Sequence, residues 1–401
     1  MDRGESVSVY DFLRDEEIVN NTHGDSVTIK ALLEELKMEY KNVRYTSYRD
    51  LGILGKIIEM LWGLKKRSKS TLNGNRLRWV ATAFLYILID KLAIIDLGFS
   101  KCAGLNKYGS YEDLIIGRPF YFSHFERTIK NNGKGKISLL EHNIEKSFFG
   151  FQLGKLGFFS KILLNDISKI EKHALKEASM IYTVSVKDKN VLADEYPAIK
   201  VKKINYNGIN SIDHLQLLIP FRNVNSGTFP NKYDPQVNID RLKVGFIGSN
   251  YSLNVESVKL LINIAKHIEN KGIIFMIIGE VSSSFKDTID IPSNLIFWGF
   301  VKDTYSVLSM CDAYILFDLM PTGIETKSLL YKQFVKLVLL VGQDNSEYDE
   351  NLGDRVLILH NKDDVINFLE NYHNLRRGAN LTILDKRGIR WGRGGDNFQS
   401  Q

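Results

Sequence analysis

Short apolar runs that alternate with stretches at helical spacing are the feature of this sequence that most constrains its fold. In the C-terminal half the runs are rich in β-branched residues and cover Lys243–Ile247, Ile273–Ile278, Leu295–Trp298, Ala313–Phe317, Val338–Val341 and Val356–Leu359. Between the first two runs, Val258, Leu261 and Ala265 fall on one face of a helix. Buried strands alternating with helices are typical of a parallel sheet covered by helices, so this half is predicted to be a Rossmann-like domain.

The N-terminal half shows the same alternation. Its predicted strands are Val7–Phe12, Val43–Tyr48, Asp113–Ile116, Ile137–Leu140, Ile181–Val184 and Val201–Ile204. Its predicted helices are Val27–Met38, Ile53–Leu64 and Asp166–Ala178, with a buried helix over Leu77–Leu92. The predicted fold class is therefore α/β, with two Rossmann-like domains facing a cleft.

The length of the chain also favours two domains, because 401 residues exceed the size at which one hydrophobic core keeps growing. The predicted boundaries are an N-terminal domain over residues 1–215 and a C-terminal domain over 242–378. Pro, Asn, Gly and Asp are dense across 219–241 and no periodicity survives there, which indicates an exposed linker. A glycine-rich, basic tail is predicted over 379–401.

Composition indicates a cytoplasmic protein. Hydrophobic residues make up 44% and charged residues 25% of the chain, as in ordinary globular proteins. Cys102 and Cys311 are far apart and neither belongs to a CxxC motif, so a disulfide framework or a structural zinc site is not expected. The N-terminus does not resemble a signal peptide, and the longest apolar run, Trp79–Ile89, is too short to span a bilayer.

The net charge of +6 is concentrated after the apolar segment Leu51–Leu64, in a basic segment that runs from Lys65 to Arg78. This arrangement suits a peripheral contact with an anionic membrane surface, at the inner face of the membrane. The alternative is a solvated helix end and loop. Binding of nucleic acid is not expected, because no zinc-finger or RRM-type signature accompanies the basic residues.

A small-residue loop follows the first predicted strand of the C-terminal domain. Gly248 and Ser249 come directly after this strand, and a helix is predicted to begin around Asn254. Small residues let a phosphate approach the backbone, and a helix N-terminus offers unpaired N–H groups. The loop is therefore a candidate phosphate site, and the alternative is an ordinary turn.

A second candidate follows the predicted strand Ala313–Phe317, in the run MPTGIETKSLLYKQF. Gly323 would allow a tight loop, and Lys327 would lie in the first turn of the next helix. A helix dipole disfavours a cation there, and a bound anion would remove the conflict. The alternative is that Lys327 is solvated or paired with Glu325.

The remaining candidates also lie at strand ends. Glu141 and His142 follow an N-terminal strand and are predicted to project into the space between the domains, although a lone histidine is as often structural. Gly279 ends one strand of the C-terminal domain, and Phe300 and Val301 follow another. These last two could contact a nucleobase, and packing is the alternative.

In this order the motifs resemble the family-4 retaining glycosyltransferases, which have the GT-B fold. The family's donor-binding run G-x-x-x-K-x-x-E-A is similar to GIETKSLLY, with Gly323 and Lys327 at matching places. The resemblance implies that Lys327 contacts the donor diphosphate and that His142, at the place of the family's HD-type histidine, lies near the transferred sugar. The two are the predicted catalytic residues. It also implies donor contacts at Gly248, Ser249, Gly279, Phe300, Val301, Gly323 and Glu325.

The chain departs from the family pattern at several places. Many members carry two glutamates where this chain has Thr322 and Leu330, and the second of them contacts the donor ribose. The usual aspartate after the histidine is Asn143, and the N-terminal glycine-rich loop is represented only by His23, Gly24 and Asp25.

The resemblance implies a glycosyltransferase whose C-terminal domain binds a nucleoside-diphosphate sugar. The hexose would be transferred, with retention of configuration and without metal or cofactor, to a glycan or lipid-linked acceptor on the N-terminal domain. Lys327 and the helix N-terminus would stabilise the departing diphosphate. Two alternatives remain, a catalytically silent binding or scaffold protein and a sugar-nucleotide epimerase. The sequence does not specify donor, acceptor or oligomeric state.

Overall fold

The structure is a computed structural model, and it divides the chain into two compact units. Unit 1 contains the described residues up to Tyr206 and unit 2 those from Arg241 onwards. The structure describes residues 4–11, 24–48, 72–94, 113–132, 135–153, 158–206, 241–288, 290–301, 304–319, 327–334, 336–342, 352, 355–377, 383–384 and 390–391.

Unit 1 is built on a six-stranded parallel sheet with the strand order β2-β1-β3-β4-β5-β6. The strands are β1 (Gly4–Asp11), β2 (Tyr40–Ser47), β3 (Asp113–Gly117), β4 (Ile137–Glu141), β5 (Met180–Thr183) and β6 (Lys200–Lys203). β3 and β4 are almost wholly buried apolar runs, as expected for central strands covered on both faces.

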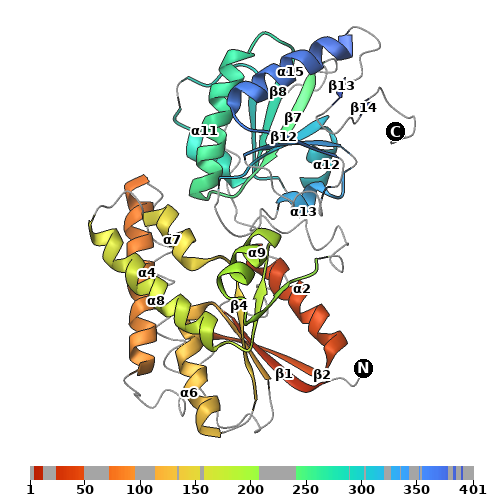
Figure 1. The fold of residues 1–401 in the computed structure, drawn as a ribbon. Helices are drawn as coiled ribbons and strands as arrows, with labels where there is room; N and C mark the ends of the chain where they lie inside the picture. The colour runs from red at the N-terminus through yellow and green to blue at the C-terminus, as the bar shows by residue number, and fades with distance from the viewer. Residues whose placement is uncertain are drawn as a thin grey trace. The chain divides into compact units, whose positions relative to one another are not determined.

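Helices cover both faces of this sheet (Figure 1). The helices are α2 (Gly24–Glu39), α4 (Leu72–Ile94), η3 (Pro119–Tyr121), α6 (Phe122–Asn132), α7 (Glu145–Leu153), α8 (Phe158–Glu177) and α9 (Val186–Glu195). The helix α2 lies on one face, and α4, α6, α7 and α8 lie on the other, where aromatic side chains dominate the core. Tyr86 stacks on Phe120 at 4.3 Å, and Tyr48 stacks on Tyr121 at 3.9 Å.

Unit 2 repeats this architecture, with a six-stranded parallel sheet in the order β12-β11-β10-β7-β8-β9. Its strands are β7 (Leu242–Ile247), β8 (Ile273–Ile278), β9 (Leu295–Gly299), β10 (Ala313–Phe317), β11 (Leu337–Val341) and β12 (Val356–Leu359). The fold class predicted from the sequence, two α/β Rossmann-like units, is confirmed by these two parallel sheets.

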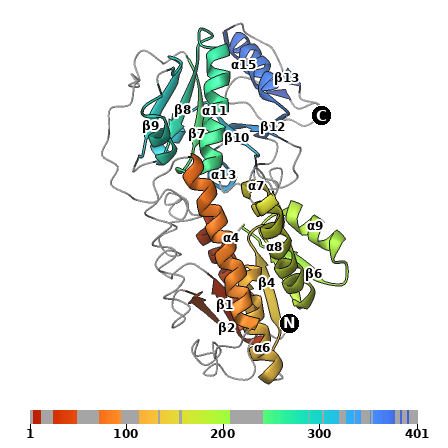
Figure 2. The same ribbon diagram turned by 90° about the vertical axis from the view of Figure 1, so that its left-hand side faces the viewer.

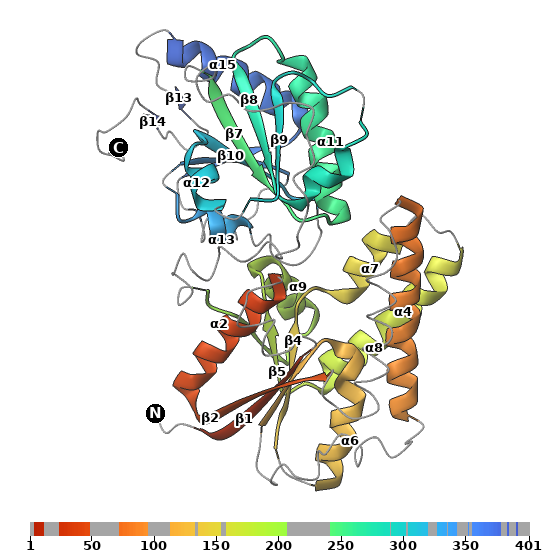
Figure 3. The same cartoon turned by 180° about the vertical axis from the view of Figure 1, so that it is seen from behind.

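The helices of unit 2 are α11 (Ser252–His267), η4 (Glu280–Phe285), α12 (Thr304–Ser309), α13 (Lys327–Tyr331) and α15 (Lys362–Arg377). The helices α11 and α15 pack against each other on one face, while α12 and α13 lie on the opposite side (Figure 3). Two short strands, β13 (Ile383–Leu384) and β14 (Arg390–Trp391), pair antiparallel in the predicted tail.

All twelve predicted sheet strands are present within a few residues of their predicted bounds. The helix α11 begins at Ser252, close to the predicted start around Asn254. Two helix predictions need correction. The helix α8 begins eight residues before the predicted start at Asp166, because Ser160 and Leu163 continue its buried face. The helix α4 is not buried all round, since Phe84 is 59% exposed.

Several sequence predictions fall outside the described residues. These are the helix Ile53–Leu64, the lysines of the basic segment, Cys102, almost all of the linker 219–241, and His23. Cys311 is buried beneath β7, where its Sγ would lie 2.6 Å from a Cβ at Gly245. Among the described residues, no helix is both long enough and apolar enough to cross a membrane.

Candidate functional site

In unit 2 the strand order itself locates a binding crevice. The chain leaves β7 towards β8 on one side, while β10, the other neighbour of β7, leads away to β11 on the opposite side. Ligands of open parallel sheets bind outside the carboxyl ends of the strands at such a switch point. The loop that contains Gly248 and Ser249 and the helix that begins at Lys327 follow these two neighbouring strands.

Glycines bring the carboxyl ends of β7, β8 and β9 into close contact. A Cβ on Gly279, whose φ is +103°, would lie 2.3 Å from the carbonyl oxygen of Gly248. The amide of Gly279 donates to the carbonyl of Gly299 at 2.7 Å, and the amide of Val281 donates to the carbonyl of Gly248 at 3.2 Å. These backbone contacts explain why a residue without a side chain is needed at position 279, and they hold the Gly248 loop in place.

Asn254 holds the Gly248 loop from the other side. Its side-chain amide donates to the carbonyl of Ser249 at 2.9 Å and to Ser249 Oγ at 3.3 Å, and a Cβ on Gly248 would meet Asn254 Cγ at 2.9 Å. The N-cap residue of α11, Tyr251, places no side-chain acceptor over the first turn. The amides of this turn therefore lack a cap from Tyr251, and a 16-residue helix directs its partial positive charge towards the loop.

Lys327 is the first residue of α13, as predicted, and lies on the β7 side of that helix. Its Nζ is 5.2 Å from the centre of the Phe246 ring, two residues before Gly248. From the same short helix, the hydroxyl of Tyr331 accepts a hydrogen bond from the amide of Ile247 at 3.3 Å. The structure thus places Lys327 and the glycine loop at the same end of the same strand.

The other predicted donor residues are placed in part. Phe300 and Val301 follow β9 and are half-buried, at the strand end farthest from β10. Gly323, Glu325 and Thr322 lie outside the described residues. Leu330, which stands where many members of the resembled family carry a glutamate, is 5% exposed on α13 and supplies no carboxylate.

In unit 1, His142 lies between two carboxylates at the carboxyl edge of the sheet. Its Nε2 is 2.8 Å from Asp11 Oδ2, and its Nδ1 is 3.5 Å from Asp25 Oδ1. Burial by itself lowers the pKa of His142, but the two carboxylates outweigh it and the pKa is raised. His142 is 3% exposed, so it does not project from the strand end as predicted. The exposed member of the group is Asp25, with 40% of its side chain accessible.

Arg118 connects this group to a second set of acids. Its guanidinium lies 2.9 Å from Asp25 Oδ2 and 3.3 Å from Glu145 Oε1. Its backbone φ of +69° is the only positive value at a non-glycine residue among those described. Such a backbone conformation is energetically unfavourable and persists only where other contacts hold the residue in place. Here the ion pairs of the Arg118 guanidinium with Asp25 and Glu145 provide such contacts.

Behind Arg118 lie three buried glutamates. Glu171 accepts hydrogen bonds from the amides of Glu145 and Lys146 and thereby caps α7. Burial raises the pKa of Glu145 to about 7, and burial together with Glu145 raises the pKa of Glu171 to about 8. Glu141 is 1% exposed, neither of its carboxyl oxygens has a hydrogen-bond partner, and burial raises its pKa well above the usual range. Glu141 is therefore a buried residue and is not an open site residue.

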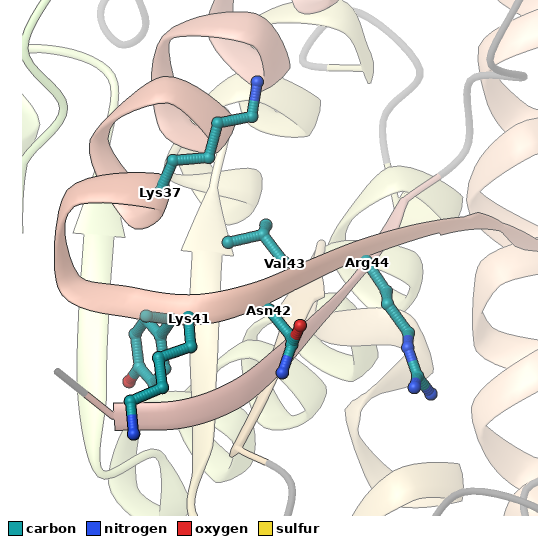
Figure 4. A pocket seen from close by; sticks show the side chains of 6 residues that line it. Lys37, Lys41, Asn42, Val43 and Arg44 are labelled. Carbon is teal, nitrogen blue, oxygen red and sulfur yellow. The ribbon is translucent and has the colours of Figure 1, made fainter.

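A hollow of about 480 Å³ lies elsewhere on unit 1, beside the edge strand β2 (Figure 4). It is lined by Lys37, Tyr40, Lys41, Asn42, Val43 and Arg44. Tyr40 begins β2 and its hydroxyl donates to Asp113 at the start of β3, so the hollow is at the amino edge of the sheet. It is separate from the Asp11–His142 group at the carboxyl edge.

Sequence reasoning named His142 and Lys327 as candidates but did not name Asp11, Arg118 or the part played by Asn254. An acidic residue at the end of the first strand was the available signal for Asp11, whereas nothing in the sequence indicates the backbone conformation of Arg118. Within the described parts of the chain, no group of three or more His, Cys, Asp or Glu side chains is arranged to hold a metal ion.

No protein-family model and no curated protein matches this sequence. Solved structures with a similar fold include TarM of S. aureus in complex with fondaparinux, α-GlcNAc-glycerol and UDP. It is 11% identical, with a TM-score of 0.43 over 68% of this chain, and the chain spans only 50% of its length. An α,α-trehalose 6-phosphate synthase of Burkholderia multivorans is 9% identical, with 93% of this chain and 90% of that chain covered and a TM-score of 0.48.

Alr3699/HepE of Anabaena, solved in complex with UDP, is also similar. It is 10% identical, with 91% of this chain and 89% of that chain covered and a TM-score of 0.47. Similarities of this size assign no function by themselves, since one fold hosts many activities.

Proposed function

We propose that this chain is a glycosyltransferase that binds a nucleoside-diphosphate sugar on unit 2 and transfers its hexose to a glycan or lipid-linked acceptor. The observation that carries the proposal is the carboxyl end of β7. A glycine loop, the first turn of α11 and the ammonium group of Lys327 meet there at a switch point of the sheet. Backbone amides and one cation suit a diphosphate better than a neutral ligand.

The chemistry follows from the charge that develops on the leaving group. As the glycosidic bond to the diphosphate breaks, negative charge accumulates on the phosphate oxygens, and a fixed cation lowers the barrier by stabilising it. Lys327 has this role, assisted by the amides in the first turn of α11. The resemblance of the motifs supports transfer with retention of configuration, and the proposal requires neither a metal ion nor another cofactor.

On unit 1, His142 acts through a neighbour in this proposal. It is buried between Asp11 and Asp25, which raise its pKa, so it is not placed to accept a proton from a substrate. Asp25 is the accessible carboxylate, fixed by His142 and Arg118. We assign it to acceptor hydroxyl groups, for which carboxylate oxygens are good hydrogen-bond acceptors. Asp25→Asn is expected to reduce transfer while nucleoside diphosphate affinity stays unchanged.

The donor site is tested by titrating UDP, GDP and ADP calorimetrically into the full chain and into Lys327→Ala. A charge-assisted contact contributes about 1.5–3 kcal/mol, so the variant is expected to bind about 10- to 150-fold more weakly. Lys259→Ala is the matched control, because Lys259 lies on α11 and pairs with Glu256 at 2.8 Å. Absence of binding by all three nucleotides, or equal weakening in both variants, would refute the donor site.

A second candidate function is a catalytically silent binding protein, favoured by the buried Leu330 where a ribose-binding carboxylate would be expected. The two are separated by incubating the purified protein with a panel of nucleotide sugars and following nucleoside diphosphate release. Release that Lys327→Ala lowers at least about tenfold supports the enzyme. Binding without release or transfer supports the silent protein.

A further inference from the structure

Large apolar side chains are exposed on the outer surface of the helical layer of unit 1. On α4, Phe84 is 59% and Leu88 41% exposed, and on α8, Phe158 is 79% and Ile162 47% exposed. These four residues are called the α4/α8 patch. Single exposed apolar residues are common on protein surfaces, but a contiguous group marks a contact site.

The two helices run in the same direction, which brings their exposed apolar residues to similar positions along the helical layer. Near the start of α4, Trp79 packs against α7, and α7 follows the carboxyl end of β4, so α4 starts at the carboxyl edge of the sheet. The helix α8 ends just before the amino end of β5, so it ends at the amino edge. Both helices therefore run from the carboxyl to the amino edge of the sheet, side by side (Figure 2). Lys91 Nζ of α4 lies 3.8 Å from Asp166 Oδ2 of α8, which shows which turns of the two helices lie side by side. On each helix the patch residues lie about one and two turns before this ion pair.

The patch is too small for a stable interface with a second copy of the chain. Four side chains of about 150–200 Å², each roughly half exposed, present about 400 Å² of apolar surface. A stable protein–protein interface buries about 800 Å² on each partner. A surface of this size is sufficient for a lipid contact, because each side chain that enters the bilayer boundary contributes separately.

Three exposed lysines lie on the same two helices as the patch. Lys161 is exposed beside Ile162, and the side chains of Lys91 and Lys169 are 61% and 69% exposed. The acid at this seam is Asp166, which lies between Lys91 and Lys169 at 3.8 and 3.9 Å. Basic side chains beside an apolar surface match the phosphate groups and acyl chains of an anionic leaflet.

We propose that the α4/α8 patch docks unit 1 on the surface of an anionic lipid bilayer. The four apolar side chains enter the boundary between headgroups and acyl chains, and the lysines at the rim contact lipid phosphates. The contact is peripheral, since no described helix is suited to cross a membrane. It does not depend on glycosyl transfer, and it uses residues other than the basic segment Lys65–Arg78.

The test is sedimentation of the full chain with vesicles of phosphatidylcholine, with and without phosphatidylglycerol. The chain is expected to bind the vesicles that contain phosphatidylglycerol, and binding is expected to weaken as salt rises. Phe84→Ser combined with Phe158→Ser should reduce binding at least about tenfold. The matched control is Met38→Ser, a side chain 75% exposed on α2, which should bind as the wild type does.

Charge is tested separately with Lys161→Glu combined with Lys169→Glu, which should abolish the preference for phosphatidylglycerol, whereas Lys259→Glu on α11 of unit 2 should not. All substituted positions are exposed, so folding is expected to be preserved, and circular dichroism checks this. The proposal is overturned if vesicles with phosphatidylglycerol are not bound at low salt or the serine variant binds equally well. A dimer in sedimentation velocity that the serine variant abolishes would also overturn it, assigning the patch to a second copy.

Discussion

Replacing Asp11 by asparagine is expected to destabilise unit 1 in a pH-dependent way. The carboxylate lies 2.8 Å from His142 Nε2, and both side chains are 1% exposed. Asparagine has the same shape and so preserves the fit against Gly117, where a Cβ would lie 1.8 Å from Asp11 Oδ2. A hydrogen bond to a charged group contributes about 1.5–3 kcal/mol and a neutral one about 0.5–1.5 kcal/mol. The exchange should therefore lower the free energy of unfolding by about 1–2 kcal/mol.

The sign of the pH dependence follows from the raised pKa of His142. Burial opposes the charge on the ring, but Asp11 and Asp25 outweigh burial. The folded protein therefore retains a proton that the unfolded chain releases near pH 6.5. The resulting stabilisation is fully present below about pH 6.5 and is lost as the pH rises through the raised pKa of the folded state. The difference between wild type and Asp11→Asn should thus be largest near pH 6.

The assay is urea denaturation of both proteins at several pH values between about 6 and 9, with the ring signals of His142 followed by NMR. Glu126→Gln is the matched control. Glu126 lies 2.9 Å from His173 Nε2, but the histidine side chain there is 46% exposed, so solvent screens the pair and the loss should be at most about 1 kcal/mol. If Asp11→Asn costs the same at every pH, or no more than the control, burial does not strengthen the pair.

Three further outcomes are expected. Gly279→Ala should destabilise unit 2 by at least about 2 kcal/mol in urea denaturation, because φ at this position is +103° and the new Cβ would meet Gly248. Gly150→Ala is the control: this glycine lies in open space on α7, so the exchange should stabilise unit 1 by about 0.5–1 kcal/mol. Because burial raises the pKa values of Glu145 and Glu171 to about 7 and about 8, the folded protein holds protons that the unfolded chain releases, so the free energy of unfolding should fall as the pH rises from about 4.5 to 8. A denaturation midpoint that stays constant across this range would contradict the raised pKa values. Lys327→Ala should weaken nucleoside diphosphate binding but change the melting temperature only slightly, because the cation–π contact of Lys327 with Phe246 contributes only about 0.5–1 kcal/mol to stability. A lower melting temperature with unchanged nucleotide affinity would show that Lys327 has a structural role.

Both sheets could be predicted because their signal is local. Most of the central strands are short apolar runs rich in β-branched residues, and buried parallel strands need such runs whatever surrounds them. Lys327 could be placed at a helix start because its strand and helix are consecutive in the sequence. Helix starts are harder to predict. The first turn of α11 mixes polar and apolar residues, so nothing in the sequence distinguishes a start at Ser252 from one at Asn254.

The sequence by itself determined the positions of the strands and the candidate residues at their ends, because strand periodicity and loop composition depend on neighbouring residues. Only the tertiary structure decided what those ends do. Asp11, Asp25, Arg118 and His142 are separated by up to 131 positions, and parallel strands bring them to one edge of the sheet. There the fold buries a histidine that was expected to be open, places it between two carboxylates that raise its pKa, and leaves Asp25 accessible. Charge state depends on surroundings assembled by the whole fold, which no short stretch of sequence contains.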